Sequence, residues 1–210
     1  MIGGISGRTS LSGEGLQHID GQSHHYAMAF PNVMAYDPAF AYELAVIIQN
    51  GLKRLYKDDE DLIYYVTMGN QAYKMPAQPK DTDEGILKGL YRFRKSRKRK
   101  NKGKKVNLLG SGSIMTEVLE AADILENDHD IPVDVCSVTS YKALYDNARD
   151  VERQNYRNGK SEKSHLEDQL SGEGEIFIAA TDFMQSGALE HCQMGAGGFY
   201  CPGYRWLRAQ

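Results

Sequence analysis

The sequence lacks any long hydrophobic run. No uninterrupted apolar stretch is longer than Leu44 to Ile48, whereas a helix needs roughly 20 apolar residues to cross a bilayer. No basic and then apolar secretory leader is visible. Cysteine is scarce, and Cys136, Cys192 and Cys201 have unrelated spacings, which favours a reduced cytoplasmic protein over a disulfide scaffold.

An excess of positive charge is also missing. The chain has 25 lysines and arginines against 28 aspartates and glutamates, for a net charge of -3. This balance argues against a general nucleic-acid or membrane-surface binder. Its 210 residues suffice for one large or two small domains with a buried core.

The most unusual stretch that is present runs from Gly7 to His25, with the sequence GRTSLSGEGLQHIDGQSHH. It combines glycines, histidines, carboxylates and an arginine with few apolar residues, which predicts a loop. Loops of this kind, held on a rigid scaffold, often carry binding and catalytic residues. A solvated connector without any chemistry is the alternative that composition leaves open.

Apolar segments elsewhere alternate between two patterns. Continuous β-branched and aromatic runs predict buried strands, and apolar residues at a spacing of three to four predict helices. We expect strands at 32–36, 62–67, 106–109, 133–138 and 176–180, and helices at 39–56, 83–93, 114–126 and 141–155. Asp37 is expected to cap the first helix, with Pro38 at its first position. The alternation predicts an α/β fold with a parallel-rich sheet.

A basic run from Arg94 to Lys105 separates the two groups of elements. A nucleic-acid or localisation patch is one interpretation, but the run has no interleaved aromatic residues for base stacking. A solvated interdomain linker is the preferred interpretation. The rival functional hypothesis is a non-catalytic α/β interaction module whose basic segment binds an acidic partner.

The residue order in the stretch from Gly7 to His25 resembles the GRTTLxGEGLQHxDGxSH segment of the homodimeric pyruvate dehydrogenase E1 family, whose members are thiamine diphosphate enzymes. Residues 67–79 (TMGNQAYKMPAQP) resemble the family's T-x-x-N-E-N-Y-x-x-P-x-x-P run. Gln71 replaces the usual glutamate there, so we do not expect that carboxylate's salt bridge. Residues 108–114 (LLGSGSI) and 181–184 (TDFM) resemble segments of the family's C-terminal domain.

The resemblance implies a domain order. Residues 1–93 correspond to the end of a transketolase-like pyrimidine-binding domain, 94–105 to a basic linker, and 106–185 to the start of a transketolase C-terminal-like α/β domain. The likeness ends near Gln185. A back-translation of residues 192–210 shifted by one base yields a product ending in GTDGFGRS, a family motif. We therefore interpret 186–210 as a frameshifted tail, and Met1 as an internal methionine of a longer protein.

The resemblance also implies a function. The whole enzyme would decarboxylate pyruvate on thiamine diphosphate with Mg²⁺, then acetylate the lipoyl group of the dihydrolipoyl acyltransferase component. It would act as a cytoplasmic homodimer, with no nucleic-acid or membrane partner. The family's Mg²⁺-diphosphate motif and its pyrimidine-facing glutamate are absent from this sequence. The chain by itself is therefore predicted to be inactive.

Within the glycine-rich stretch, His18 matches the family's substrate-pocket histidine. Imidazole can both give and take a proton near neutral pH, and Glu14 could orient that ring or the loop. A histidine that is merely hydrogen-bonded is the simpler alternative. A metal site from His18, Asp20, His24 and His25 is another hypothesis. Those ligand types suit zinc, but their spacing matches no common zinc motif.

Overall fold

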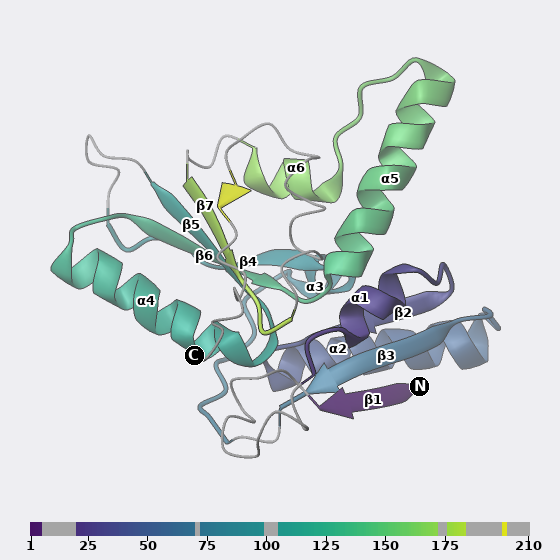
Figure 1. The fold of residues 1–210 in the computed structure, drawn as a ribbon, viewed down its shortest axis with the longest axis horizontal. Helices are drawn as coiled ribbons and strands as arrows, with labels where there is room; N and C mark the ends of the chain where they lie inside the picture. The colour runs from purple at the N-terminus through teal and green to yellow at the C-terminus, as the bar shows by residue number, and fades with distance from the viewer. Residues whose placement is uncertain (6–19, 70–71, 99–104, 172–175, 184–198, 201–210) are drawn as a thin grey trace, which may run out of the picture.

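The computed structural model describes residues 1–5, 20–69, 72–98, 105–171, 176–183 and 199–200. They form two sheets flanked by helices (Figure 1). The first sheet has the strand order β1-β3-β2, and all its pairings are parallel. Its strands are β1 Ile2–Ile5, β2 Val33–Tyr36 and β3 Ile63–Met68.

The second sheet has the order β4-β6-β5-β7-β8. β4 runs antiparallel to β6, and the other pairings are parallel. Every residue of β5 and of β6 is buried, as expected of parallel strands that are covered on both faces. The strands are β4 Leu90–Arg94, β5 Val106–Gly110, β6 Val133–Val138, β7 Ile176–Ala180 and β8 Phe199–Tyr200.

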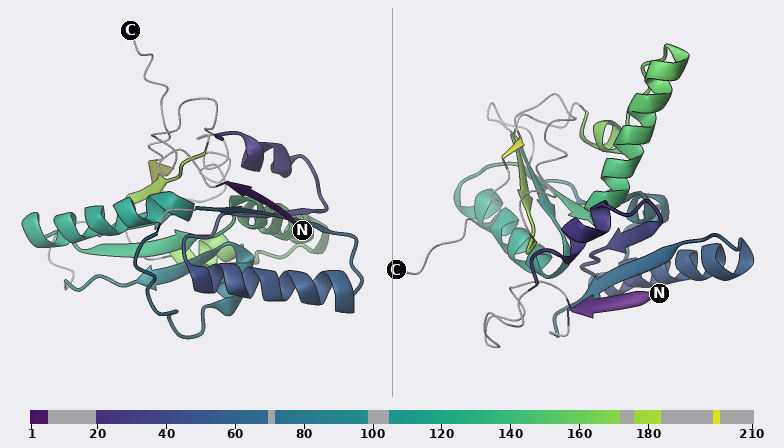
Figure 2. Two further views of the ribbon diagram at one scale, coloured as in Figure 1. Left: turned by 90° about the horizontal axis from the view of Figure 1, so that it is seen from below. Right: turned by 45° about the vertical axis from the view of Figure 1, so that its right-hand side comes forward.

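The helices cover the sheets, and α5 projects away from them (Figures 1 and 2). A π-helical turn, η3, continues α2, and a 3₁₀ turn, η4, leads into α4. The bounds are α1 Ser23–Met28, α2 Ala41–Leu52, η3 Lys53–Lys57, α3 Asp83–Lys88, η4 Gly112–Ile114, α4 Met115–Asp128, α5 Tyr141–Asn158 and α6 His165–Leu170.

The two sheets share a continuous core. Tyr36, Ile47 and Tyr64 form the buried cluster between α2 and the first sheet. The partly buried Tyr42 and Phe93 pack against this cluster and also against the core of the second sheet. The two halves are therefore joined by side-chain packing as well as by the chain.

The five predicted strands and the helices expected at 39–56, 114–126 and 141–155 are confirmed to within a few residues. The helix expected at 83–93 is wrong in its second half. It ends at Lys88, because Gly89 takes a left-handed conformation with φ of 98°. A β-carbon at Gly89 would overlap the backbone of Ser140. The chain turns there, and Leu90–Arg94 pairs with β6 as a strand.

Two further local predictions are corrected. Asp37 does not cap α2, whose N-cap is Phe40. The Glu43 carboxylate accepts the backbone N–H groups of Ala39 (2.6 Å) and Phe40 (3.0 Å) instead. The loop predicted through His25 is helical from Ser23 onward, as the start of α1. In the tail, where no strand was expected, residues 199–200 form β8.

Candidate functional site

The carboxyl ends of strands from both sheets meet at one place. Asp37, just after β2, donates its backbone N–H to the Thr139 carbonyl after β6 (2.8 Å). The Asp37 carbonyl in turn accepts the N–H of Gly112, which follows β5 (3.0 Å). Ligands of open α/β sheets bind outside the carboxyl ends of parallel strands. This junction is therefore the candidate functional site.

The Asp37 side chain is buried at the centre of the junction, with 5% of its surface exposed. Its Oδ1 accepts a hydrogen bond from Thr67 Oγ1 at the end of β3 (2.6 Å). The carboxylate lies directly against Gly112, where a β-carbon would overlap both of its oxygens. Burial raises the pKa of Asp37 to about 7, and the charge of Asp182 adds to that rise.

His24 reaches the same hydroxyl from α1. Its Nε2 lies 2.9 Å from Thr67 Oγ1. Its ring packs edge-on against Phe183, with the centroids 4.5 Å apart, and is tilted against Tyr65 at 5.4 Å. Burial lowers the pKa of His24 to about 4, although the nearby Asp20 charge opposes this. The imidazole is therefore neutral at neutral pH.

Asp20 orients the helix that carries His24. Its Oδ1 accepts the backbone N–H groups of Gln22 and Ser23, each at 3.0 Å. Its Oδ2 accepts the Ser23 hydroxyl. A short acidic side chain that binds backbone N–H groups two and three residues ahead fixes a turn into a helix. Asp20 therefore sets the direction in which α1 leaves the glycine-rich stretch.

A small cavity of about 30 Å³ lies at the junction. It is large enough for a single water molecule. Its lining residues come from α1, from the ends of β2, β6 and β7, and from the start of α5: His24, His25, Met28, Asp37, Val138, Thr139, Ser140, Tyr141, Lys142, Thr181 and Phe183. Residues from both sheets and from α1 therefore line the same cavity.

The residues predicted to be catalytic, Glu14 and His18, lie outside the described residues, as does Gln71. Asp20, His24 and His25 from the hypothetical metal set are described. Within the described ranges, no group of three His, Cys, Asp or Glu side chains could hold a metal ion. Asp20 is committed to the turn before α1.

Sequence reasoning missed the site roles of Asp37 and Thr67. The sequence pattern predicts Asp37 as a helix cap, and it predicts Thr67 only as the end of a strand and part of a family motif. A signal was available, because both residues end predicted parallel strands. Polar side chains at that edge are the ones that face a ligand site.

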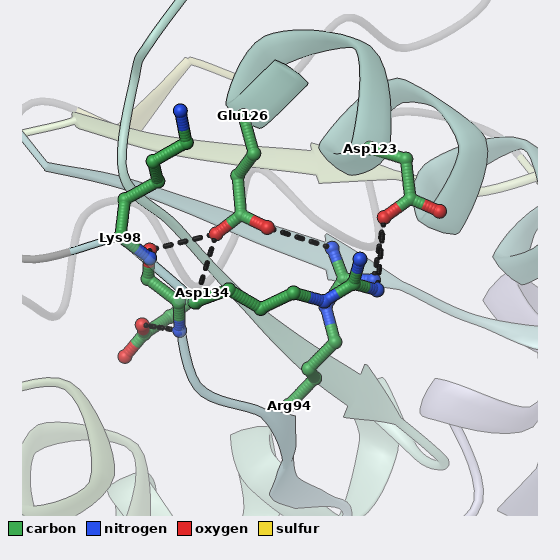
Figure 3. A network of polar contacts seen from close by, with 7 residues as sticks. Arg94, Lys98, Asp123, Glu126 and Asp134 are labelled. Carbon is green, nitrogen blue, oxygen red and sulfur yellow. Dashed lines mark hydrogen bonds and ion pairs between the residues drawn. The ribbon is translucent and has the colours of Figure 1, made fainter.

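The basic segment is anchored to α4 and β6 at its described ends. Figure 3 shows the contacts near its Arg94 end. Arg94 pairs with Asp123 at 2.8 Å and with the buried Glu126 at 3.7 Å. Lys105 pairs with the buried Asp134 at 2.6 Å. The described ends of the predicted solvated linker are therefore packed, because buried carboxylates require cationic partners.

Two more cations in the described part of the basic segment pair with acidic side chains. Arg97 pairs with Asp123 at 3.1 Å, and Lys98 pairs with Asp130 at 2.7 Å. These pairs compete with any acidic partner for the same cations. Among the described residues, no helix is both long and apolar enough to cross a membrane.

Family comparisons agree with this architecture. Residues 1–76 match the model of the pyruvate dehydrogenase E1 component middle domain. Residues 89–198, just over half of the chain, match the model of the transketolase-like TK C-terminal domain. The chain belongs to the pyruvate dehydrogenase E1 family. The second match begins at Gly89, where α3 ends and β4 is about to start, and it continues beyond Gln185.

Individual members of this family are similar to the chain in sequence. The pyruvate dehydrogenase E1 component of Pseudomonas aeruginosa is 46% identical over 187 residues, which are 88% of this chain and 21% of that protein. The E1 component of Escherichia coli K12 is 50% identical over 156 residues, or 74% of this chain and 17% of that protein. The chain thus spans about a fifth of the length of these E1 relatives.

Solved structures support the same fold. Transketolase from Campylobacter jejuni superposes with a TM-score of 0.61 at 20% identity, covering 95% of this chain and 26% of that one. Transketolase from Leishmania mexicana gives 0.59 at 16% identity, covering 89% and 23%. The predicted α/β, transketolase-like fold and the family resemblance are both confirmed.

Proposed function

We propose that this chain is part of a pyruvate dehydrogenase E1 that decarboxylates pyruvate and reductively acetylates the lipoyl group of a dihydrolipoyl acyltransferase. The observation that carries the proposal is 46% identity over 187 residues to a protein of that name. The junction of strand ends around Asp37 and His24 supports it, because a site for a small ligand is expected at such an edge.

The cofactor of the whole enzyme would be thiamine diphosphate with Mg²⁺, which supplies the carbanion chemistry when bound. The residues of this chain do not fit that group by themselves. The diphosphate motif and the pyrimidine-facing glutamate are absent from the sequence, and the described residues offer no cluster for a metal ion. We therefore assign this chain no contact with the cofactor.

We propose that this chain contributes side chains that act on the substrate. His18 would exchange a proton with the reacting group, and Glu14 would orient that imidazole. We place the division between the pyrimidine-binding and C-terminal domains near Gly89, because β4 pairs within the second sheet. The homodimer partner, the acyltransferase partner and the cytoplasmic location follow from family membership and belong to the same proposal.

The test compares the 210-residue chain with a longer protein that also carries the thiamine-binding region. We expect no release of CO₂ from pyruvate by the short chain and measurable release by the longer one. His18→Gln in the longer protein should lower kcat by a factor of about 100, as expected for loss of a proton-transferring group. Pyruvate decarboxylation by the short chain alone would contradict the proposal.

The non-catalytic alternative has its own test. An interaction module that uses the basic segment would bind an acidic polymer with a steep salt dependence. The ion pairs of Arg94, Arg97, Lys98 and Lys105 favour the enzyme instead. We expect weak polyanion binding that changes little when Lys98 is neutralised.

A further inference from the structure

A relay of three side chains, Asp37, Thr67 and His24, crosses the junction and links the first sheet to α1. Thr67 has a single hydroxyl proton, and its Oγ1 lies 2.6 Å from Asp37 Oδ1 and 2.9 Å from His24 Nε2. A charged Asp37 can only accept a hydrogen bond, so Thr67 donates to it. The Thr67 oxygen must then accept a hydrogen bond from His24, whose Nε2 therefore carries the proton.

We propose that Thr67 and Asp37 are positioning residues that hold the His24 imidazole as its neutral Nε2–H tautomer. The tautomer of a histidine is set by the hydrogen bond that one ring nitrogen makes. Nδ1 then carries the lone pair. Within the described residues, Nδ1 has no hydrogen-bond partner.

The surroundings of the ring favour a fixed orientation. Phe183 packs edge-on against the imidazole from just after β7, and Tyr65 lies against it from β3. The packing limits ring rotation, and Thr67 determines which nitrogen faces the strand ends. His24 also lines the cavity, and a ring nitrogen that carries a lone pair can accept a hydrogen bond from an O–H group such as that of a water molecule.

The relay would give His24 a role in the proposed function. The tautomer of His24 can nevertheless be tested separately from that function. If the junction serves a 2-oxo acid dehydrogenase, the Nδ1 lone pair would meet a hydroxyl or thiol of a reacting group. This role of the lone pair rests on the proposed function. The tautomer itself is a property of the 210-residue chain and is measured without substrate.

The experiment is ¹⁵N NMR of the histidine rings in the 210-residue chain at about pH 8, where Asp37 is charged. We expect the Nε2–H tautomer of His24 to exceed the Nδ1–H tautomer by about tenfold, since only the Nε2–H tautomer can donate to Thr67 and an ordinary neutral hydrogen bond supplies about that ratio. Thr67→Ser retains the hydroxyl and should retain the ratio. Thr67→Val and Asp37→Asn should bring the two tautomers to comparable populations.

Thr82→Val is the matched control, because it also removes a buried threonine hydroxyl but lies outside the relay. It should leave the His24 spectrum unchanged. A predominant Nδ1–H tautomer in the unmodified chain would overturn the inference, even if no variant folds. An unchanged ratio in folded Thr67→Val would do the same. If the expected tautomer occurs but the longer protein does not decarboxylate pyruvate, the proposed function fails and the relay stands.

Discussion

Tyr91 donates its hydroxyl hydrogen to Glu43 Oε1 at 2.6 Å, and this bond joins β4 of the second sheet to α2 of the first. The same carboxylate oxygen accepts the Ser137 hydroxyl from β6, also at 2.6 Å. Glu43 has no exposed surface, and burial raises its pKa. One buried carboxylate therefore ties together α2 and two strands of the other sheet.

Tyr91→Phe should destabilise the chain. The substitution keeps the ring but removes one donor to Glu43 and the acceptor for the Tyr42 hydroxyl, which lies 2.5 Å away. Loss of a buried hydrogen bond that leaves a polar partner unsatisfied should lower the unfolding free energy by about 1–3 kcal/mol in urea titrations. Tyr156→Phe, at a 91% exposed position, should stay within about 0.5 kcal/mol of the unmodified chain. Equal effects at both positions would contradict the bridging role.

Gly112→Ala should be costly for two reasons. Gly112 has a positive φ of 51°, and its missing β-carbon leaves the space that the Asp37 carboxylate fills. Gly159→Ala separates the two effects, because its φ is 62° but no atom lies within 4 Å of the position that a β-carbon would take. We expect about 1 kcal/mol of destabilisation at Gly159 from backbone strain alone. The loss at Gly112 should be at least twice as large in the same urea experiment.

The pH dependence of stability should change in Asp37→Asn. The pKa of Asp37 rises from 3.8 when unfolded to about 7 when folded, so the folded chain retains a proton that the unfolded chain releases. This contribution is fully present below about pH 4 and is lost as pH rises through about 7, on the order of 4 kcal/mol in total. The stability of the unmodified chain relative to Asp37→Asn should therefore fall between about pH 4 and pH 7. A constant difference across that range would contradict the raised pKa.

His24 should affect the pH dependence of stability in the direction opposite to Asp37. Its pKa falls from 6.5 to about 4 on folding, so the unfolded chain binds a proton that the folded chain does not. This contribution is present above about pH 6.5 and is lost as pH falls toward 4. His24→Gln should be relatively more stable at about pH 5 than at about pH 7. Urea titrations of this variant beside the unmodified chain at both pH values measure the difference.

Asp134→Asn should show that the anchor of the basic segment is buried. Asp134 is 2% exposed, and its carboxylate meets Lys105 and also accepts the backbone N–H of Ser96 at 2.8 Å. Neutralising one partner of a buried ion pair should cost about 3–5 kcal/mol. Asp150→Asn removes an exposed pair with Arg153 at 3.4 Å and should cost less than about 1 kcal/mol. Similar small losses at both sites would indicate that the segment is not anchored.

Local sequence patterns predicted much of the fold. Residues 133–138 hold three valines, whose β-branched side chains favour a strand, and β6 has those bounds. The apolar spacing in 141–155 likewise predicted α5. Leu90–Arg94 has no such local signature, because its strand conformation depends on pairing with β6 across a long sequence separation. The edge strand β1 was not predicted for the same reason, because it pairs with β3. The short α6 does have a local signal, the capping box of Ser164 and Glu167.

The candidate site was predicted less completely. Glu14 and His18 remain predictions, since they lie outside the described residues. The sequence could not reveal that Asp37, Thr67 and His24 converge, because they come from three separate elements that only the packing of the first sheet and α1 brings together. Their pKa values depend on burial, which only packing produces.

The sequence by itself determined the family and the order of most strands and helices, because residue order in the motifs and apolar periodicity are local properties of the chain. Only the tertiary structure decided that Gly89 ends a helix, that the basic segment is ion-paired, and that Asp37 meets Thr67 rather than a helix end. Each of those outcomes depends on a partner distant in sequence, whose position is fixed only when the two sheets pack together.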